Sequence, residues 1–293
     1  MSRRSSSGRP QVPEVVTERW SPAGWEEVAD RLAAEEPLQL LIDGEPLSIV
    51  MRTPGRDVEL ALGLLWAERV ITDRAQVRRV RLSAEAGESE LADAPFRVDT
   101  DLMESNQVDV NLSSESGRRP ERSFLSTSAC GVCGATTLES LALDFQQVAS
   151  GPFVDPTVLG WLPERLRAKQ RLFDQTGGLH AAGLFDAQGN LDTLREDVGR
   201  HNAVDKVVGR ALLDGRLPLA AHILLVSGRG GYEIVQKAVA AGIPMVAAVG
   251  APSSLAVATA RRFGVTLVGF LRDRRFNVYS APERLRRFTY SRS

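Results

Sequence analysis

HILLVSGRGGYEIVQKAVAAGIPMVAAVG, at residues 222–250, is the stretch that decides the fold. It contains two continuous apolar segments, ILLV and MVAAV, separated by residues with helical spacing. The alternation continues with a predicted helix at 253–263 and the apolar strand VTLVGFLR at 265–272. Continuous apolar strands separated by helices are typical of a buried, largely parallel sheet with helices on both faces. We therefore predict an α/β domain over residues 151–293.

The first part of this domain is predicted to contain a hairpin. A helix at 157–173 comes first, and the strands GLHAAGLFD and NLDTLREDV follow it, joined by a turn at Gly189-Asn190. A helix at 201–213 then leads to the stretch quoted above, and FNVYS at 276–280 adds a last strand.

Residues 25–112 are predicted to form a smaller α+β domain. PLQLLIDGEPLSIVM, at 37–51, has two short strands around an Asp-Gly turn, and residues 55–71 carry apolar side chains at helical spacing. The segments VRRVRLS and QVDVNL, at 77–83 and 107–112, alternate apolar and polar residues, as strands with one wet face do.

The chain outside these two domains is polar. Residues 1–24 begin with a basic, serine-rich stretch that leads into no apolar segment, and we predict a disordered tail. Residues 113–150 start with a polar stretch at 113–129 that breaks every periodicity. We predict a mobile loop there, followed by a helix at 136–148.

The composition is that of a soluble globular protein. Of 293 residues, 43% are hydrophobic and 25% are charged. The net charge of -1 gives no electrostatic reason to expect a nucleic acid as partner. No segment approaches the roughly 18 apolar residues that span a membrane. We expect a cytoplasmic protein whose thiols stay reduced.

ACGVCG, at 129–134, contains the only two cysteines of the chain, Cys130 and Cys133. A closed zinc site needs four ligands, and no second Cys-x-x-Cys exists; a disulfide here would close only a very short loop. The predicted helix at 136–148 would place its positive end near Cys133 and favour a thiolate. We therefore favour thiol transfer over zinc binding, dithiol redox exchange and an inert pair. The histidines that could complete a zinc site are His180, His201 and His222.

Three other segments carry residues suited to phosphate groups. SGRGGYEIVQKA, at 227–238, is a glycine-rich turn before a helix, where backbone N–H groups can hold phosphate oxygens and an arginine adds a forked donor. VGAPSSLAVATA, at 249–260, repeats this geometry, and FLRDRRFNVYS, at 270–280, clusters arginines between two strands. A plain capped loop and a solvated hairpin tip are the alternatives for the last two. The candidate contacts of the first turn are Gly228, Arg229 and Gly230.

REDVGRHNAVDKVVG, at 195–209, places charged residues at a strand-to-helix junction. One interpretation is an amphipathic helix with solvated charges. Because α/β sheets bind ligands at such junctions, Asp197, His201 and Lys206 are also candidates for a site.

His180, in GLHAAG, is a lone histidine in an apolar strand, where a core residue is the more common interpretation. Zinc deaminases place a ligand in such a strand, followed two residues later by a proton-shuttling glutamate. Ala182 stands at that position, and the Cys-x-x-Cys lies upstream of the histidine rather than downstream. Deamination is therefore poorly supported.

Taken in order, these motifs resemble those of the formate dehydrogenase accessory sulfurtransferase family (FdhD). The resemblance runs from about residue 40 to residue 285. It rests on ACGVCG, GGLHAAGLF, REDVGRHNAVDKVVG, SGRGGYEIVQKA, GIPMVAAVGAPSSLAVATA and FLRDRR. It implies a cytidine-deaminase-like α/β fold for residues 151–293, without deaminase chemistry.

The resemblance also implies an activity, the delivery of sulfur to the molybdenum cofactor of formate dehydrogenase. A cysteine desulfurase would load a persulfide on Cys130, with Cys133 assisting or sharing it. The protein would bind the bis(molybdopterin guanine dinucleotide) cofactor of molybdenum or tungsten and hold no metal of its own. It would serve the catalytic subunit of formate dehydrogenase.

The resemblance places the guanine contacts in FLRDRR, at Phe270, Leu271, Arg272, Asp273, Arg274 and Arg275. Asp273 and Arg274 stand where a Gly-containing turn is expected. The phosphate contacts at Gly228, Arg229 and Gly230 and the site role of His201 are inferred from the residues alone. We also expect a homodimer, since the Ala- and Val-rich helices at 232–263 can pack on a second subunit.

Two other functions stay open. A zinc-dependent nucleotide or base hydrolase would hold stoichiometric zinc through Cys130, Cys133 and His180. A cofactor-binding chaperone would dock the cofactor without moving sulfur, and it would work without Cys130.

Overall fold

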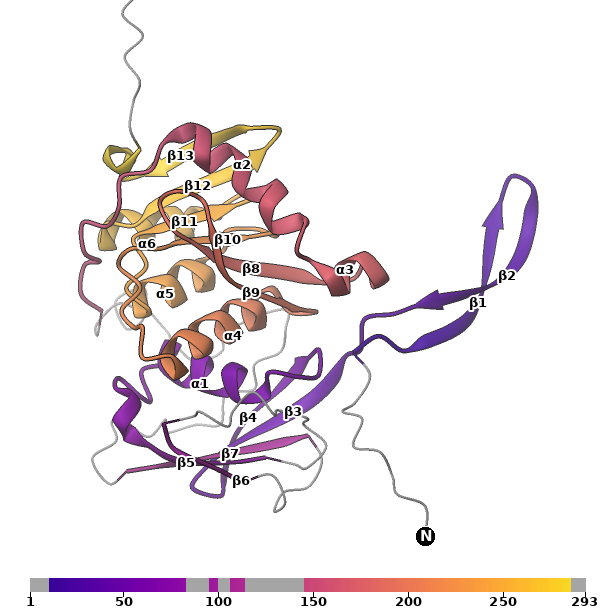
Figure 1. Ribbon diagram of the computed structural model, residues 1–293, viewed down its shortest axis with the longest axis horizontal. Helices are drawn as coiled ribbons and strands as arrows, with labels where there is room; N and C mark the ends of the chain where they lie inside the picture. The colour runs from indigo at the N-terminus through magenta and orange to yellow at the C-terminus, as the bar shows by residue number, and fades with distance from the viewer. Residues whose placement is uncertain (1–10, 83–94, 100–105, 114–144, 286–293) are drawn as a thin grey trace, which may run out of the picture.

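Two β-sheets, their helices and a projecting arm make up the computed structural model of the protein (Figure 1). The structure describes residues 11–82, 95–99, 106–113 and 145–285. One sheet has six strands, the other has five, and the arm is a two-stranded hairpin.

The six-stranded sheet belongs to the carboxy-terminal half. Its strands are β8 (His180–Phe185), β9 (Leu191–Asp197), β10 (Ile223–Val226), β11 (Met245–Ala248), β12 (Thr266–Arg272) and β13 (Arg275–Ser280). In space they follow the order β13-β12-β11-β10-β8-β9. β10, β11 and β12 run parallel, whereas β8, β9 and β13 pair antiparallel with their neighbours. The predicted parallel sheet is thus found only at the centre, because short hairpins place β9 beside β8 and β13 beside β12.

Helices cover both faces of this sheet, as predicted. One face carries α4 (Arg200–Leu213), α5 (Tyr232–Ala240) and α6 (Ser254–Phe263), and the other carries α2 (Pro156–Arg167). Because successive side chains of a strand point to opposite faces, each strand contributes to the hydrophobic core on both sides of the sheet. In β10, Leu224 packs in the core on the α4 side, and Ile223 and Leu225 pack in the core on the α2 side.

The five-stranded sheet is built by the amino-terminal half. Its strands are β3 (Glu36–Ile42), β4 (Glu45–Arg52), β5 (Val77–Leu82), β6 (Arg97–Asp99) and β7 (Gln107–Leu112), in the spatial order β4-β3-β7-β5-β6. The predicted Asp43-Gly44 turn joins β3 to β4. α1 (Asp57–Ala67), all of whose residues are buried, packs between this sheet and α4 (Figure 1). The described ranges also contain two short 3-10 turns, η1 (Arg74–Gln76) and η4 (Pro282–Arg284).

α1 and α4 touch at the level of their backbones. A Cβ atom on Gly63 would lie 1.9 Å from the carbonyl oxygen of Asp205, and one on Gly209 would lie 1.8 Å from that of Glu59. A side chain at either position would collide with the other helix, so only glycine permits this approach. One hydrophobic core consequently runs through both sheets, and the two predicted domains are packed together on it.

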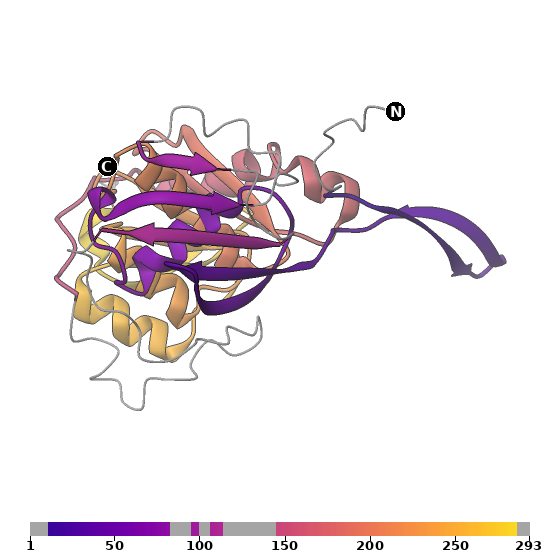
Figure 2. The same cartoon turned by 90° about the horizontal axis from the view of Figure 1, so that it is seen from below.

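The arm consists of β1 (Glu14–Ser21) and β2 (Gly24–Arg31), which pair antiparallel and stand away from the body (Figures 1 and 2). The disordered tail predicted for residues 1–24 is therefore wrong from Glu14 onward, and residues 1–10 lie outside the described part. The reason is the β-branched and aromatic content of VVTERW and WEEVA, which favours strands despite the intervening charges.

Two of the helices differ from their predictions. The helix predicted at 157–173 is divided into α2 and the short α3 (Arg171–Thr176). Residues 145–148 are not helical, and the remainder of the helix predicted at 136–148 lies outside the described residues. Within the part of the chain that the structure describes, no membrane-spanning helix is found.

Candidate functional site

Most of the segments predicted from the sequence to form a site lie at one end of the six-stranded sheet. We call this end the edge of the sheet; it is where the parallel strands have their carboxyl ends. β10, β11 and β12 end at this edge, and β8 begins there because it runs antiparallel to β10. His180, the first residue of β8, pairs with Asp197, the last residue of β9. The turns that follow β9, β10, β11 and β12 therefore lie along one edge (Figure 1). Edges of this kind are where α/β sheets bind ligands.

Two strand-to-helix turns are tied together at this edge. The turn at 228–231 precedes α5, and the turn at 249–253 precedes α6. The N–H of Gly250 donates to the carbonyl of Gly228 at 3.0 Å, and a Cβ on Gly250 would lie only 3.1 Å from that oxygen. No side chain caps the start of α5 within the described residues, so its first N–H groups are left for water or a ligand.

Four basic side chains gather around the turn at 228–231. They are His180, Arg200, His201 and Arg229. A Cβ on Gly228 would lie 3.4 Å from Nδ1 of His180 and 3.6 Å from Cδ of Arg200, so both side chains reach this turn. The four residues come from β8, α4 and the turn itself, and the fold brings them together.

Both of these histidines are neutral at pH 7. Burial, followed by the positive charges of Lys237 and Arg200, lowers the pKa of His201 to about 3. Burial and the charge of Arg200 also lower the pKa of His180, although Asp197 opposes that shift. The positive charge of the cluster therefore comes from its two arginines.

Arg200 has an unsatisfied hydrogen-bond donor. Its Nε is buried, and it has no hydrogen-bond partner within the described residues. Leaving a buried donor unpaired costs about 1–3 kcal/mol, so such groups are uncommon in folded proteins. A phosphate or another oxyanion would accept this hydrogen bond and balance the charge of the guanidinium.

His201 is held by Glu233, in the first turn of α5. Nδ1 of His201 lies 3.1 Å from Oε2 of Glu233. Because the ring is neutral, we assign the proton to Nδ1, which donates to the carboxylate, and Nε2 is left as an acceptor. This contact links α4 to α5 beside the glycine turn.

Asp197 and Lys206, two of the predicted site residues, form a buried junction instead. They are 0% and 1% exposed, and Nζ of Lys206 lies 2.6 Å from Oδ2 of Asp197. Asp197 also accepts the N–H groups of Thr53 and Gly199, at 3.2 and 2.8 Å. Lys206 donates to the carbonyl of Thr53 at 2.9 Å. These contacts fasten the start of α4 to the loop after β4, and they leave neither side chain accessible to a ligand.

The hairpin of β12 and β13 extends the same edge. Phe270 has a positive φ of 54°, and its N–H donates to the carbonyl of Gly250 at 3.1 Å, which fastens the hairpin to the glycine turns. Asp273 and Arg274 form the hairpin turn with φ values of 51° and 57°. The turn is therefore made without glycine, by two residues in the left-handed region.

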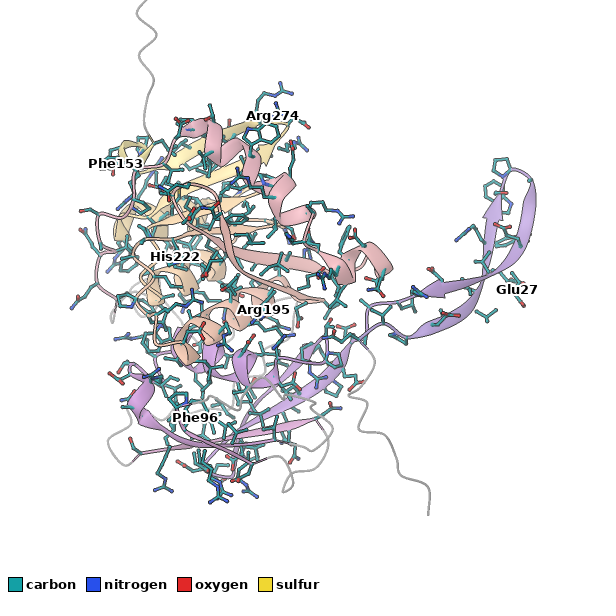
Figure 3. The ribbon with its side chains drawn as sticks, viewed as in Figure 1. Glu27, Phe96, Phe153, Arg195, His222 and Arg274 are labelled. Atoms are coloured by element: carbon teal, nitrogen blue, oxygen red, sulfur yellow. The ribbon has the colours of Figure 1, made fainter. Side chains whose placement is uncertain are left out.

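The residues of this hairpin differ in what they offer a ligand. Leu271 is 0% exposed and packs in the core beneath α2, so any ligand contact from this residue would come from its backbone. The guanidinium of Arg274 lies 3.5 Å from the centre of the Trp161 ring, at the end of the molecule labelled in Figure 3. Among the six residues predicted as guanine contacts, those that are exposed and have no such partner ring within the described chain are Phe270, Arg272, Asp273 and Arg275.

Cys130 and Cys133 lie outside the described residues, and the predictions about them stay predictions. The described chain pauses after Ser113 and resumes at Phe145, whose ring packs edge to face on Phe263 with 6.2 Å between centroids. In the described ranges, no three His, Cys, Asp or Glu side chains are grouped as metal ligands. His222 lies at the opposite end of β10 from His180.

Arg200 and Glu233 are the functional candidates that the sequence did not single out. Arg200 lies within REDVGRHN, where nothing distinguishes it from its charged neighbours. For His180 the sequence favours a core residue over a metal ligand, and the structure makes it only half-buried, beside the glycine turn. The antiparallel pairing of β8 with β10 produces this contact. In the sequence, the predicted hairpin of β8 and β9 is the one feature that indicates where His180 lies relative to this turn.

Fold and site together define an α/β protein with a cationic edge suited to an anionic ligand. The model of the FdhD/NarQ family matches residues 33–286, so the chain belongs to this family. Similar relatives include the "Sulfur carrier protein FdhD" of Streptomyces coelicolor, 48% identical over 260 residues, which cover 87% of this chain and 89% of that protein. The protein of the same name from Mycolicibacterium paratuberculosis is 47% identical over 262 residues, 87% of this chain and 92% of that one.

A solved structure is also similar. It is that of a candidate formate dehydrogenase accessory protein from Desulfotalea psychrophila, with a TM-score of 0.72 and 25% identity. The match covers 94% of this chain and 100% of that chain. The resemblance found from the motifs is thereby confirmed at the level of the family.

Proposed function

We propose that this protein is a sulfurtransferase that serves formate dehydrogenase. It accepts a persulfide sulfur from a cysteine desulfurase and transfers it to the bis(molybdopterin guanine dinucleotide) cofactor of molybdenum or tungsten. The observation that carries the proposal is the cationic edge with its unsatisfied Arg200 donor, in a chain of the FdhD/NarQ family. The relatives named sulfur carrier proteins support the same chemistry.

The diphosphate groups of the cofactor are assigned to the turn at 228–231. Arg200 and Arg229 supply charge-assisted hydrogen bonds, and the uncapped start of α5 supplies backbone N–H groups. Gly228 is half-buried and lets a ligand approach the backbone closely. Gly230 is buried, and a Cβ at this position would lie 3.2 Å from Cβ of Ala248. Its N–H donates to the carbonyl of Ala251 at 3.2 Å, so this residue shapes the turn rather than meeting the ligand. His201 contributes Nε2 as an acceptor for a ligand hydroxyl or amine.

The guanine ends are assigned to the hairpin of β12 and β13. Arg272 and Arg275 are exposed and form no ion pair within the described residues. An arginine fork matches the O6 and N7 acceptors of guanine. The exposed ring of Phe270 offers a surface on which a base can stack.

Sulfur uptake is assigned to Cys130. Its thiolate attacks the outer sulfur of the persulfide on the desulfurase, a new S–S bond forms, and the cysteine of the desulfurase leaves as a thiolate. Cys133, three positions further on, assists or shares the persulfide. In the second transfer the S–S bond would break, Cys130 would leave as a thiolate, and the outer sulfur would become a sulfido ligand of the bound cofactor, whose metal would supply the two electrons required. No metal held by the protein itself is part of this scheme.

The proposal also includes the setting in which the protein acts. Residues 151–293 are taken as a cytidine-deaminase-like domain and residues 25–112 as a smaller one. Ala182 is fully buried where a deaminase requires a glutamate, which agrees with a different chemistry. We place the protein in the cytoplasm, where thiols are kept reduced, and expect it to act as a homodimer.

Intact-protein mass spectrometry tests the proposal. After incubation with a cysteine desulfurase and L-cysteine, the wild type is expected to gain one reductant-labile sulfur, about 32 Da. Cys130→Ala should gain none, and Cys133→Ala shows whether the second thiol is needed. If no form gains sulfur while the desulfurase turns over, the sulfurtransferase function is wrong.

A cofactor chaperone that moves no sulfur is the second candidate. It is favoured by the fact that the described part of the site consists of groups suited to holding the cofactor. A Cys130→Ala protein that fully activates formate dehydrogenase would select this function. Stoichiometric zinc that is lost in Cys130→Ala would select the hydrolase instead.

A further inference from the structure

The arm of β1 and β2 exposes aromatic side chains that nothing in the described chain covers. Trp20 and Trp25, at its tip, are 62% and 71% exposed, and Val16 is 69% exposed nearer its root. A hairpin of two strands without a third strand or a helix against it is marginally stable in water. Tryptophan is enriched in protein interfaces, where its large surface is buried.

These side chains share one face of the arm with two carboxylates. Residues directly opposite each other in a hairpin lie on the same face, and so do residues two positions apart. The cross-strand pairs on this face are Val16–Ala29, Glu18–Glu27 and Trp20–Trp25. The face is therefore acidic at its centre and apolar on either side.

The two carboxylates are not compensated. Glu18 and Glu27 stand directly opposite each other, an arrangement that like charges make unfavourable. Within the described residues, neither forms an ion pair or a side-chain hydrogen bond. The next pair along, on the other face, shows the contrast, because Arg19 lies 3.7 Å from Glu26. Figure 3 labels Glu27 on the projecting arm, away from the body.

Carboxylates beside exposed indole rings are suited to a cationic side chain. The carboxylates would form charge-assisted hydrogen bonds with an arginine or a lysine. The indole faces would attract the same cation and cover its aliphatic stem. The complementary surface is thus a protein surface with basic side chains beside apolar contacts.

The root of the arm adjoins the candidate site. β2 contacts α3, the helix that leads into β8. A Cβ on Gly178, two residues before His180, would lie 3.5 Å from Cβ of Ala33, which follows β2 where the arm joins the body. The arm therefore leaves the body at the edge where the cationic cluster lies (Figure 1). A protein bound to the arm would face that edge.

We propose that the arm docks the protein that takes the cofactor from this edge, the catalytic subunit of formate dehydrogenase. The contact on that subunit is an apolar patch bordered by arginine or lysine. This inference rests on the proposed function for the identity of the partner. The acceptor, rather than the desulfurase, is chosen because the arm borders the cofactor edge. The desulfurase and a second copy of this chain are the competing occupants.

The test is the binding of the full chain to a purified catalytic subunit prepared without cofactor, measured by biolayer interferometry. The double variant Trp20→Ala/Trp25→Ala is expected to bind about 30-fold more weakly or worse, since both residues would be central aromatic anchors. Glu18→Gln/Glu27→Gln should bind more weakly at low salt and should lose most of the salt dependence. Phe153→Ala, which removes a 60% exposed ring from another part of the surface, is the matched control and should bind as the wild type does.

The outcomes separate this inference from the proposed function. Unchanged affinity in the tryptophan variant, or a wild type that does not bind the subunit, would overturn the docking role. A tryptophan variant that instead loses the desulfurase, or changes its sedimentation from dimer to monomer, would overturn the choice of partner. Sulfur uptake on Cys130 is measured separately by mass spectrometry and should be normal in every arm variant. Its failure in the wild type would count against the sulfurtransferase alone.

Discussion

Residues 195–209 contain two groups of charged side chains with opposite roles. Asp197 and Lys206 are buried, and their polar atoms form an ion pair with each other and hydrogen bonds with the backbone. Arg200 lies between them in sequence, yet its buried Nε has no partner within the described residues. The hydrogen bonds of Asp197 and Lys206 are made within the protein and stabilise the fold, whereas the unpaired donor of Arg200 needs a partner that the described residues do not supply.

Removal of Asp197 should produce the largest effect of this comparison. Asp197→Ala leaves the Lys206 ammonium buried without its counter-ion, and loss of one partner from a buried pair costs about 3–5 kcal/mol. The free energy of unfolding, measured in urea, should fall by that amount. Asp174→Ala removes one partner of the exposed pair with Arg167 and should change stability by less than about 1 kcal/mol. Equal effects from the two variants would show that the buried junction is not a framework element.

Removal of Arg200 should weaken ligand binding without lowering the stability of the fold. Arg200→Ala eliminates a buried donor that has no partner, so the melting temperature should stay the same or rise. Its affinity for GDP, a probe with a diphosphate and a guanine, should fall about 10- to 100-fold, as expected when charge-assisted hydrogen bonds are lost. Arg78→Ala, at an exposed arginine of the five-stranded sheet, is the control for net charge. GDP binding that is equally tight in Arg200→Ala would remove this residue from the site.

A smaller effect is expected from the pH dependence of His201. Its pKa is about 3 in the folded protein, against an ordinary value of 6.5, so between these values the unfolded chain binds a proton that the folded chain does not. Stability should therefore fall as pH drops from 6.5 toward 3, by at most about 1.4 kcal/mol per pH unit from this group. His201→Gln should lose less stability than the wild type between pH 6.5 and 4.5. If the melting temperatures of the two proteins changed with pH by the same amount, the buried, neutral state of the His201 imidazole would be contradicted.

The sequence was sufficient for most of the fold. The apolar strands around ILLV and MVAAV predict the centre of the six-stranded sheet because buried strands need side chains that are apolar on both faces. The arm could not be predicted in the same way. Its strands bury almost nothing, so no periodicity of burial is present in the sequence, and only β-branched and aromatic content indicates them.

The site was predicted only in part. Spacing placed Asp197, His201 and Lys206 together at one junction, but it does not tell which side chain points into the protein. The inward orientation of Asp197 and Lys206 depends on Thr53, which is more than a hundred positions away in the sequence. The backbone of Thr53 forms hydrogen bonds with both side chains. The glycine turn at 228–231 lies where the pattern placed it, because a turn between a parallel strand and its helix has few alternative positions.

The hydrogen bond from Phe270 to Gly250 sets a distance. It joins the hairpin to the glycine turns through main-chain atoms, so the spacing between the backbone of the hairpin and the backbone of the turn at 228–231 does not depend on any side-chain rotamer. Under the proposed function, this fixed spacing would select ligands by length. A molecule with a base and a diphosphate at the matching separation would contact the hairpin and the glycine turn at once, and a molecule without the nucleotide portion would contact only one of them. Selection among cofactors of different length would then be a property of the backbone.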